Sequence, residues 1–237
     1  MNLLRIIANI FGYDLLRQSK DILIERHLIN LLKKHNIDSI IDVGANHGQY
    51  ARSLRNMGYQ GEIHSFEPLK TAYHELHILS QQDQNWHVYQ HALGQKADEM
   101  DINVMAYDDF SSFLEPTQYC SDTFSYKSEI DHQETVQIKR LDDVLASKLT
   151  GKTIHLKMDT QGFDLEVFHG AGDLLKSVKT LQSEISIRQL YDGMPDYITA
   201  LQTFRDAGFS ISGLFPVTRD KQDLSVIEFD CVMVKSG

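Results

Sequence analysis

Two acidic residues flank a glycine turn at the spacing of a nucleoside-binding site. The segment IIDVGANHGQY covers residues 40–50, and Gly44 and Gly48 in it allow a sharp turn and the close approach of a ligand. Asp42 precedes this turn, and Glu67 follows it about 20 residues later in the sequence SFEP. A carboxylate at the second position typically accepts hydrogen bonds from both ribose hydroxyls, since it has two acceptor oxygens. The pattern therefore predicts an adenosine-binding site.

The charges of these side chains distinguish between adenosine cofactors. A dinucleotide-binding turn has the form G-x-G-x-x-G, but Asn46 stands where the second glycine belongs. Asp42 would repel a pyrophosphate, whereas it suits a ligand with an ammonium group. S-adenosylmethionine carries an ammonium and a sulfonium and has no phosphate, so the sequence favours it over NAD. The cofactor-binding residues predicted from the two segments are Asp42, Gly44, Ala45, Asn46, Gly48, Glu67 and Pro68.

A second strand and turn, KMDTQG at residues 157–162, carries a further acid. Alternate residues of a strand share a face, so Asp159 either projects toward the ligand crevice or pairs with Lys157. Glu184 ends the next expected strand and should neighbour Asp159 across the sheet. Two carboxylates there can act as a base, position a substrate hydroxyl or hold a cation. We predict Asp159 as the catalytic base or orienting group and Glu184 as the second candidate, and the sequence leaves a metal requirement open.

Short apolar runs rich in β-branched residues alternate with helical stretches, which is typical of a mostly parallel sheet. Seven core strands are expected, at residues 39–43, 62–66, 86–90, 153–158, 180–187, 209–215 and 226–234. Helices are expected at residues 22–34, from about 47, at 69–80, from about 163 and at 195–207. This order predicts a doubly wound, Rossmann-like α/β sheet that ends in an antiparallel edge strand.

An irregular insert at residues 106–130 interrupts this pattern between two additional strands expected at 101–105 and 135–139. Long inserts in compact domains are usually functional lids or mobile segments. We expect this insert, together with the loop at residues 216–225, to shape the pocket for the acceptor.

Composition limits the partners and the location. The 237 residues carry a formal net charge of −10 without a dense basic cluster, which argues against general binding to nucleic acid. The only cysteines, Cys120 and Cys231, form no disulfide framework, so a cytoplasmic protein is expected. No apolar run approaches the ~20 residues that a transmembrane helix needs.

The chain is expected to have an N-terminal helical extension, residues 1–34, and a main domain, residues 35–237. The apolar spacing between residues 1 and 20 predicts an amphipathic helix. Such a helix packs on its own domain or on a second subunit in a homodimer, or it attaches weakly to a membrane surface.

Five segments together resemble the FkbM family of methyltransferases over residues 35–235. In chain order they are IDVGANHGQYARSLRNMGYQGEIHSFEPL, HALG, SSFL, LKMDTQGFDLEVFHGA and LYDGMP. The resemblance implies a class I methyltransferase fold, S-adenosylmethionine as the cofactor and transfer to an oxygen, often of a sugar or polyketide. It places the end of the third strand, with His91 and Ala92, beside the adenine. Many members carry Glu where this chain has Gln161, so the resemblance transfers no catalytic or metal role to that position.

The sequence predicts O-methylation of a small-molecule or glycan hydroxyl. The hydroxyl oxygen would attack the methyl carbon in line, and the protein would mainly align the reacting atoms. Two alternatives remain at this point. One is a nicotinamide-dependent oxidoreductase, which Asn46 and Asp42 disfavour, and the other is a non-catalytic protein that binds the adenosine cofactor.

Overall fold

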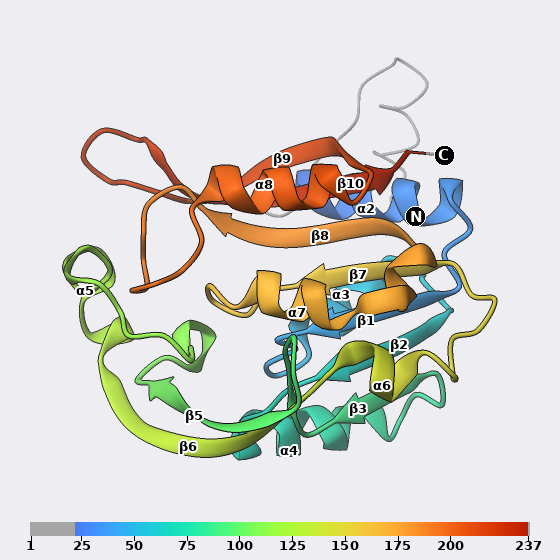
Figure 1. The fold of residues 1–237 in the computed structure, drawn as a ribbon, viewed down its shortest axis with the longest axis horizontal. Coiled ribbons are helices and arrows are strands. Elements are labelled where there is room, and N and C mark those ends of the chain that lie inside the picture. The colour runs from blue at the N-terminus through green and yellow to red at the C-terminus, as the bar shows by residue number, and fades with distance from the viewer. Residues whose placement is uncertain (1–21, 237) are drawn as a thin grey trace, which may run out of the picture.

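The computed structural model describes residues 22–236 and shows a seven-stranded sheet with helices packed on both faces (Figure 1). Its strands, in spatial order, are β3 (Trp86–Tyr89), β2 (Glu62–Phe66), β1 (Ser39–Val43), β7 (Ile154–Met158), β8 (Val178–Ser186), β10 (Val226–Lys235) and β9 (Phe209–Arg219). The strands from β3 to β8 run parallel, whereas β10 is antiparallel to both β8 and the edge strand β9. This arrangement confirms the Rossmann-like sheet that the sequence predicts. Its strand order reverses between β1 and β7, where open α/β sheets bind ligands.

Alternate residues of the central strands enter two separate cores, because successive side chains of a strand point to opposite faces. Ile41 of β1 packs in the same core as Phe168, and Ile40 packs in the other core with Leu54. The helices of the first face are α6 (Leu141–Leu145), α7 (Asp164–Gly170) and α8 (Tyr197–Asp206). The helices of the second face are α2 (Ile22–Lys34), α3 (Gln49–Asn56) and α4 (Lys70–Ser80). The two helical layers therefore hold the strand ends of the site in fixed positions.

The insert connects two strands of a second, three-stranded sheet beside the main one. This sheet consists of β4 (Ala92–Leu93), β6 (Ile130–Lys139) and β5 (Asp98–Met105), in that spatial order. The chain between β5 and β6 forms η1 (Asp108–Phe110), α5 (Gln118–Phe124) and η2 (Ser125–Ser128), so it is more regular than the sequence predicts. The hydroxyl of Thr117 caps α5 by accepting the N–H of Cys120 at 3.2 Å. The strands β5 and β6 also extend well beyond the predicted ranges.

The predicted helix at residues 22–34 is present as α2, and its Leu28 and Leu31 pack against Val232 of β10. The amphipathic helix predicted within residues 1–20 lies outside the described residues. Within residues 22–236, no helix is long and apolar enough to cross a membrane.

Candidate active site

The turn between β1 and α3 brings two strand ends into contact. Gly44 has φ +72°, and a Cβ atom there would lie 1.9 Å from the carbonyl oxygen of Asp159. Only glycine fits between these backbones. Asn46 is also left-handed, with φ 46°, a conformation that asparagine adopts more readily than most residues. Its backbone N–H donates to Oε2 of Glu67 at 2.8 Å, so the turn fixes the position of that carboxylate.

Glu67 is a buried carboxylate in which each oxygen accepts one backbone N–H. Oε2 accepts from Asn46, and Oε1 accepts from Leu69 at 2.9 Å. Burial raises the pKa of Glu67 to about 7, although these two hydrogen bonds act in the opposite direction. Each carboxylate oxygen has a second lone pair and can still accept a hydroxyl proton. Glu67 can therefore receive a pair of hydroxyl groups such as those of a ribose.

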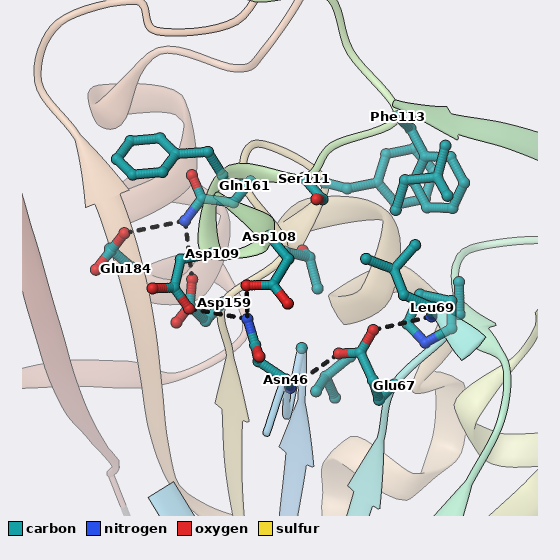
Figure 2. A pocket seen from close by; sticks show the side chains of 18 of the residues that line it. Asn46, Glu67, Leu69, Asp108, Asp109, Ser111, Phe113, Asp159, Gln161 and Glu184 are labelled. Carbon is teal, nitrogen blue, oxygen red and sulfur yellow. Dashed lines mark hydrogen bonds between the residues drawn. The ribbon is translucent and has the colours of Figure 1, made fainter. Parts of the chain in front are cut away.

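A cavity of about 330 Å³ lies at the carboxyl ends of β1, β2 and β7. Figure 2 shows Leu69 and Glu67 at one end, Gln161 and Glu184 at the other, and Asn46 between them. Six carboxylates line the cavity, and no lysine or arginine of the described part of the chain does so. The cavity therefore suits a ligand that is positively charged or neutral.

Two fully buried polar atoms of residues that line the cavity have no hydrogen-bond partner among the described residues. They are Nε2 of His91 and Oδ1 of Asn46. The side chain of His91 is 7% exposed, and burial lowers its pKa to about 4, so its ring is neutral near pH 7. Buried polar atoms without partners are rare in proteins. Their presence here, next to Glu67, fits a cavity that receives an adenosine.

The structure brings most of the predicted cofactor residues to this cavity, whose lining includes Gly44, Asn46, Glu67, Pro68, His91 and Ala92. Ala45 and Gly48 lie outside it. Ala45 is buried in the core between α3 and the sheet. A Cβ on Gly48 would lie 2.9 Å from the side chains of Leu76 and Trp86, so this glycine is needed for packing. A cofactor contact for Ala45 or Gly48 stays a prediction.

Asp42 is fully buried and does not line the cavity. Its Oδ1 lies 3.2 Å from Nζ of Lys157, and its Oδ2 accepts the hydroxyl of Ser65 at 3.2 Å. Lys157 also donates to the carbonyl oxygen of Gly44 at 3.0 Å. Burial disfavours the charge of Lys157, but the carboxylates of Asp42 and Asp159 outweigh this effect and raise its pKa. Asp42 thus holds Lys157 against the turn, and its predicted contact with the ammonium group stays untested.

Asp159 and Glu184 lie together at the ends of β7 and β8, and Gln161 bridges them. Nε2 of Gln161 donates to Oδ1 of Asp159 at 3.2 Å and to Oε1 of Glu184 at 3.3 Å (Figure 2). Burial and the nearby Asp159 raise the pKa of Glu184 well above its ordinary value, which favours the protonated form. The side chain of Asp159 is 34% exposed, and its Oδ2 lies 3.5 Å from Nζ of Lys157, so both alternatives predicted for it occur together.

Tyr191 and Ser112, whose roles do not follow from the sequence, hold Gln161 in place. The hydroxyl of Tyr191 lies 3.0 Å from Oε1 of Gln161, and the hydroxyl of Ser112 donates to its carbonyl oxygen at 2.7 Å. The backbone of Gln161 itself has the left-handed conformation, with φ 50°. The segments SSFL and LYDGMP contain Ser112 and Tyr191, so they pointed to these residues without indicating what they contact.

The insert reaches the glycine turn through η1. Nδ2 of Asn46 donates to Oδ1 of Asp109 at 2.8 Å. His47 lies between two carboxylates, 2.7 Å from Asp108 and 2.8 Å from Glu75. Burial opposes the charge of His47, but these carboxylates outweigh it and raise its pKa. Asp108 and Asp109 line the cavity, so the insert forms part of its wall. Within residues 22–236, no three His, Cys, Asp or Glu side chains are arranged to hold a metal ion.

Solved structures with a similar fold include methyltransferases. An rRNA methylase from Streptococcus thermophilus aligns with a TM-score of 0.50 at 10% identity, over 94% of this chain and 100% of that chain. Fibrillarin from Aeropyrum pernix, crystallised with natively bound S-adenosyl-L-methionine, aligns with a TM-score of 0.47 at 11% identity, over 83% of this chain and 66% of that chain. At 10% identity, the likeness to the rRNA methylase shows the fold alone. No curated protein matches the sequence.

The fold, together with a family match over residues 42–211, identifies a class I methyltransferase that depends on S-adenosylmethionine. The model of the methyltransferase FkbM domain matches residues 42–211, and the chain belongs to this family. The family assignment gives no support to the oxidoreductase or to the non-catalytic alternative.

Proposed function

We propose that the protein methylates a hydroxyl oxygen of an uncharged acceptor, such as a sugar, a glycan or a secondary metabolite. The observation that supports this proposal is the position of Asp159, a partly exposed carboxylate in the cavity wall. Its contacts with Gln161 and Lys157 fix its orientation. A carboxylate in this position can accept the proton of a substrate hydroxyl. Such a base typically contributes ~10²–10⁴-fold to the rate.

The residues around the cavity fit the cofactor that the family uses. Glu67 offers acceptor oxygens to the ribose, and the neutral His91 offers a polar edge to the adenine. Bound S-adenosylmethionine supplies a methyl group on a positively charged sulfur. The acidic lining of the cavity favours that charge electrostatically.

Glu184 has a second role in this proposal. A protonated carboxyl can donate a hydrogen bond, which an ionised one cannot do. Glu184 would therefore donate to an oxygen of the acceptor while Asp159 accepts a proton, and Gln161 would keep the two groups at a fixed separation. This division of roles suits an acceptor that carries neighbouring oxygens, as sugars do.

The lining also limits the charge of the acceptor. A phosphate-rich acceptor would face six acidic side chains, of which only Glu184 is proposed to be neutral, in a cavity where no described lysine or arginine offsets them. The structural relative from Streptococcus thermophilus is named as an rRNA methylase. For this chain, the acidic cavity and the net charge of −10 favour a neutral acceptor over RNA.

The variant Asp159→Asn tests the assignment of the base. An acceptor is first identified by mass spectrometry, from uncharged glycans and secondary metabolites incubated with isotope-labelled cofactor. We then expect kcat to fall by ~10²–10⁴-fold, because the amide cannot take up the proton. Affinity for S-adenosylhomocysteine, measured by calorimetry, should change by less than about twofold.

The control for this test is Asp173→Asn, which changes a carboxylate that is 89% exposed and should leave both quantities unaltered. Normal turnover by Asp159→Asn with normal cofactor binding would show that Asp159 is not the base.

A further inference from the structure

One carboxylate of the cavity comes from the insert, and its position is distinct from those of the strand-end acids. Asp109 lies in η1, accepts a hydrogen bond from Asn46 at 2.8 Å and is close enough to Asp159 for their charges to interact. In Figure 2 it lies between Glu67 and Glu184 along the cavity. It therefore stands between the acid suited to the ribose and the acid at the acceptor end.

The amino-acid end of the cofactor carries an ammonium group, which has three N–H donors and needs an acceptor. Asp42 does not line the cavity, because it is fully buried, and its Oδ1 lies 3.2 Å from Nζ of Lys157. The acid predicted from the sequence thus leaves the ammonium without a partner inside the cavity.

The acids of the cavity differ in how far their oxygens are already engaged. Both oxygens of Glu67 accept backbone N–H groups, and both oxygens of Asp159 have a partner, namely Gln161 and Lys157. Asp108 is occupied by His47 at 2.7 Å. These three carboxylates therefore have their charge or their hydrogen-bond capacity partly satisfied.

Asp109 is different, because its Oδ1 accepts from Asn46 and its Oδ2 has no hydrogen-bond partner within residues 22–236. The remaining acids, Glu184 and Glu228, lie toward β8 and β10, beyond Asp159. Asp109 is thus the carboxylate next to the glycine turn with an uncommitted oxygen.

We propose that Asp109 binds the ammonium group of the cofactor, so that the insert closes over the amino-acid end of the bound molecule. The hydrogen bond from Asn46 orients the carboxylate, and Asn46 in turn is fixed to Glu67 through its backbone N–H. The two acids would therefore bind the ribose and the amino-acid end of one cofactor molecule, and Asn46 of the glycine turn connects them. The proposal rests on the cofactor cavity of the proposed function and is independent of the acceptor and of the base.

A comparison of two ligands isolates the contribution of the ammonium contact to binding from that of the rest of the site. S-adenosylhomocysteine has the amino-acid end, whereas 5′-methylthioadenosine lacks it and keeps the adenosine and the sulfur. We expect Asp109→Asn to weaken the binding of S-adenosylhomocysteine, measured by calorimetry, by about tenfold or more. This is the size of effect typical of a hydrogen bond between charged groups. The same variant should weaken 5′-methylthioadenosine by less than about threefold.

The matched control is Asp108→Asn, which removes the neighbouring charge of η1 and its contact with His47. If η1 merely supports the cavity wall, each variant weakens the binding of both ligands by the same factor. Equal losses for both ligands in Asp109→Asn, or no loss for S-adenosylhomocysteine, would overturn the proposal. Because no acceptor is used, these outcomes are separate from a failure of Asp159 as the base.

Hydrogen exchange gives a second measurement. S-adenosylhomocysteine should slow amide exchange across residues 106–129 more than 5′-methylthioadenosine does in the wild-type protein. In Asp109→Asn this difference should disappear, while circular dichroism shows an unchanged fold. Equal protection by the two ligands in the wild-type protein would contradict closure by the ammonium group.

Discussion

Glu67 combines full burial with two hydrogen bonds from backbone N–H groups, and these features affect its proton in opposite directions. Burial dominates and raises its pKa to about 7. Ionised Glu67 offers more acceptor sites to a ribose than protonated Glu67 does, since protonation converts one oxygen into a donor. Binding of the adenosine part should therefore depend on pH close to neutrality.

We expect the affinity for 5′-methylthioadenosine to rise several-fold between pH 6 and pH 8. This ligand has no amine that titrates in the range, so the change reports on the protein. Glu67→Gln removes the titrating group and should bind about tenfold more weakly, with a flat pH profile. Calorimetry at pH 6, 7 and 8 provides the measurement. An equal affinity of the wild-type protein at pH 6 and pH 8 would contradict the role given to Glu67.

The same carboxylate affects the stability of the unliganded protein. Its pKa lies near 7 in the folded state and at the ordinary value of 4.5 when unfolded, so folding favours the protonated form. The contribution of Glu67 to the free energy of unfolding therefore falls as the pH rises from about 4.5 to 7. This loss accompanies the burial of a carboxylate that, in the proposed function, binds the ribose.

At the scale of elements, the strands buried on both faces are the ones that the sequence predicts best. β1 and β2 have the predicted bounds, because an apolar run such as SIIDV suits a strand covered by helices on each side. β5 and β6 expose many of their side chains, and the apolar pattern therefore marks only part of each strand. The short helix α5 is stabilised by its Thr117 cap and by the packing of Cys120. Neither feature produces a periodic apolar pattern in the sequence.

The contact between β1 and β7 is the element junction on which the site depends. Gly44→Ala would place a Cβ atom 1.9 Å from the carbonyl oxygen of Asp159 and would also strain a backbone with φ +72°. We expect the free energy of unfolding to fall by about 3 kcal/mol or more and cofactor binding to be lost. Chemical denaturation and calorimetry measure the two effects.

A matched control separates the clash from the strain. Gly58 also has a positive φ, +90°, but no atom lies within 4 Å of a Cβ built there. Gly58→Ala should therefore cost only the backbone strain, about 1–2 kcal/mol, and leave binding unchanged. Similar losses in both variants would show that the strand ends are not as closely packed as described.

The candidate site was predictable where its residues follow strands and was hidden where they come from the insert. Gly44, Glu67, Asp159 and Glu184 are found from strand ends, because the carboxyl ends of parallel strands meet at one edge of a sheet. Asp109 lies 63 residues from Asn46 along the chain, and only the tertiary fold brings them together. The burial of Asp42 is equally a property of the packed sheet, since Lys157 approaches it from a different strand.

At the scale of the whole molecule, the distribution of charge bears on the proposed acceptor. The formal net charge of −10 repels polyanions at long range, and the carboxylates of the cavity repel them at short range. Lys157 is buried and paired with Asp42, so it cannot offer a phosphate contact without breaking that pair. If the acceptor is uncharged, as proposed, its recognition relies on hydrogen bonds and apolar packing.

This charge distribution leads to an expectation for RNA. Non-specific binding of RNA depends on the release of counterions by basic side chains, and proteins that bind it reach Kd values of ~10⁻⁴–10⁻⁶ M. We expect a fluorescein-labelled RNA of about 20 nucleotides, single-stranded or duplex, to bind this protein with a Kd above ~10⁻⁴ M in about 100 mM salt. Fluorescence anisotropy measures the affinity, and binding of S-adenosylhomocysteine by the same sample shows that the protein is competent. Micromolar binding that weakens with added salt would mean that a basic surface dominates over the acidic cavity, and the acceptor would then have to be sought among nucleic acids.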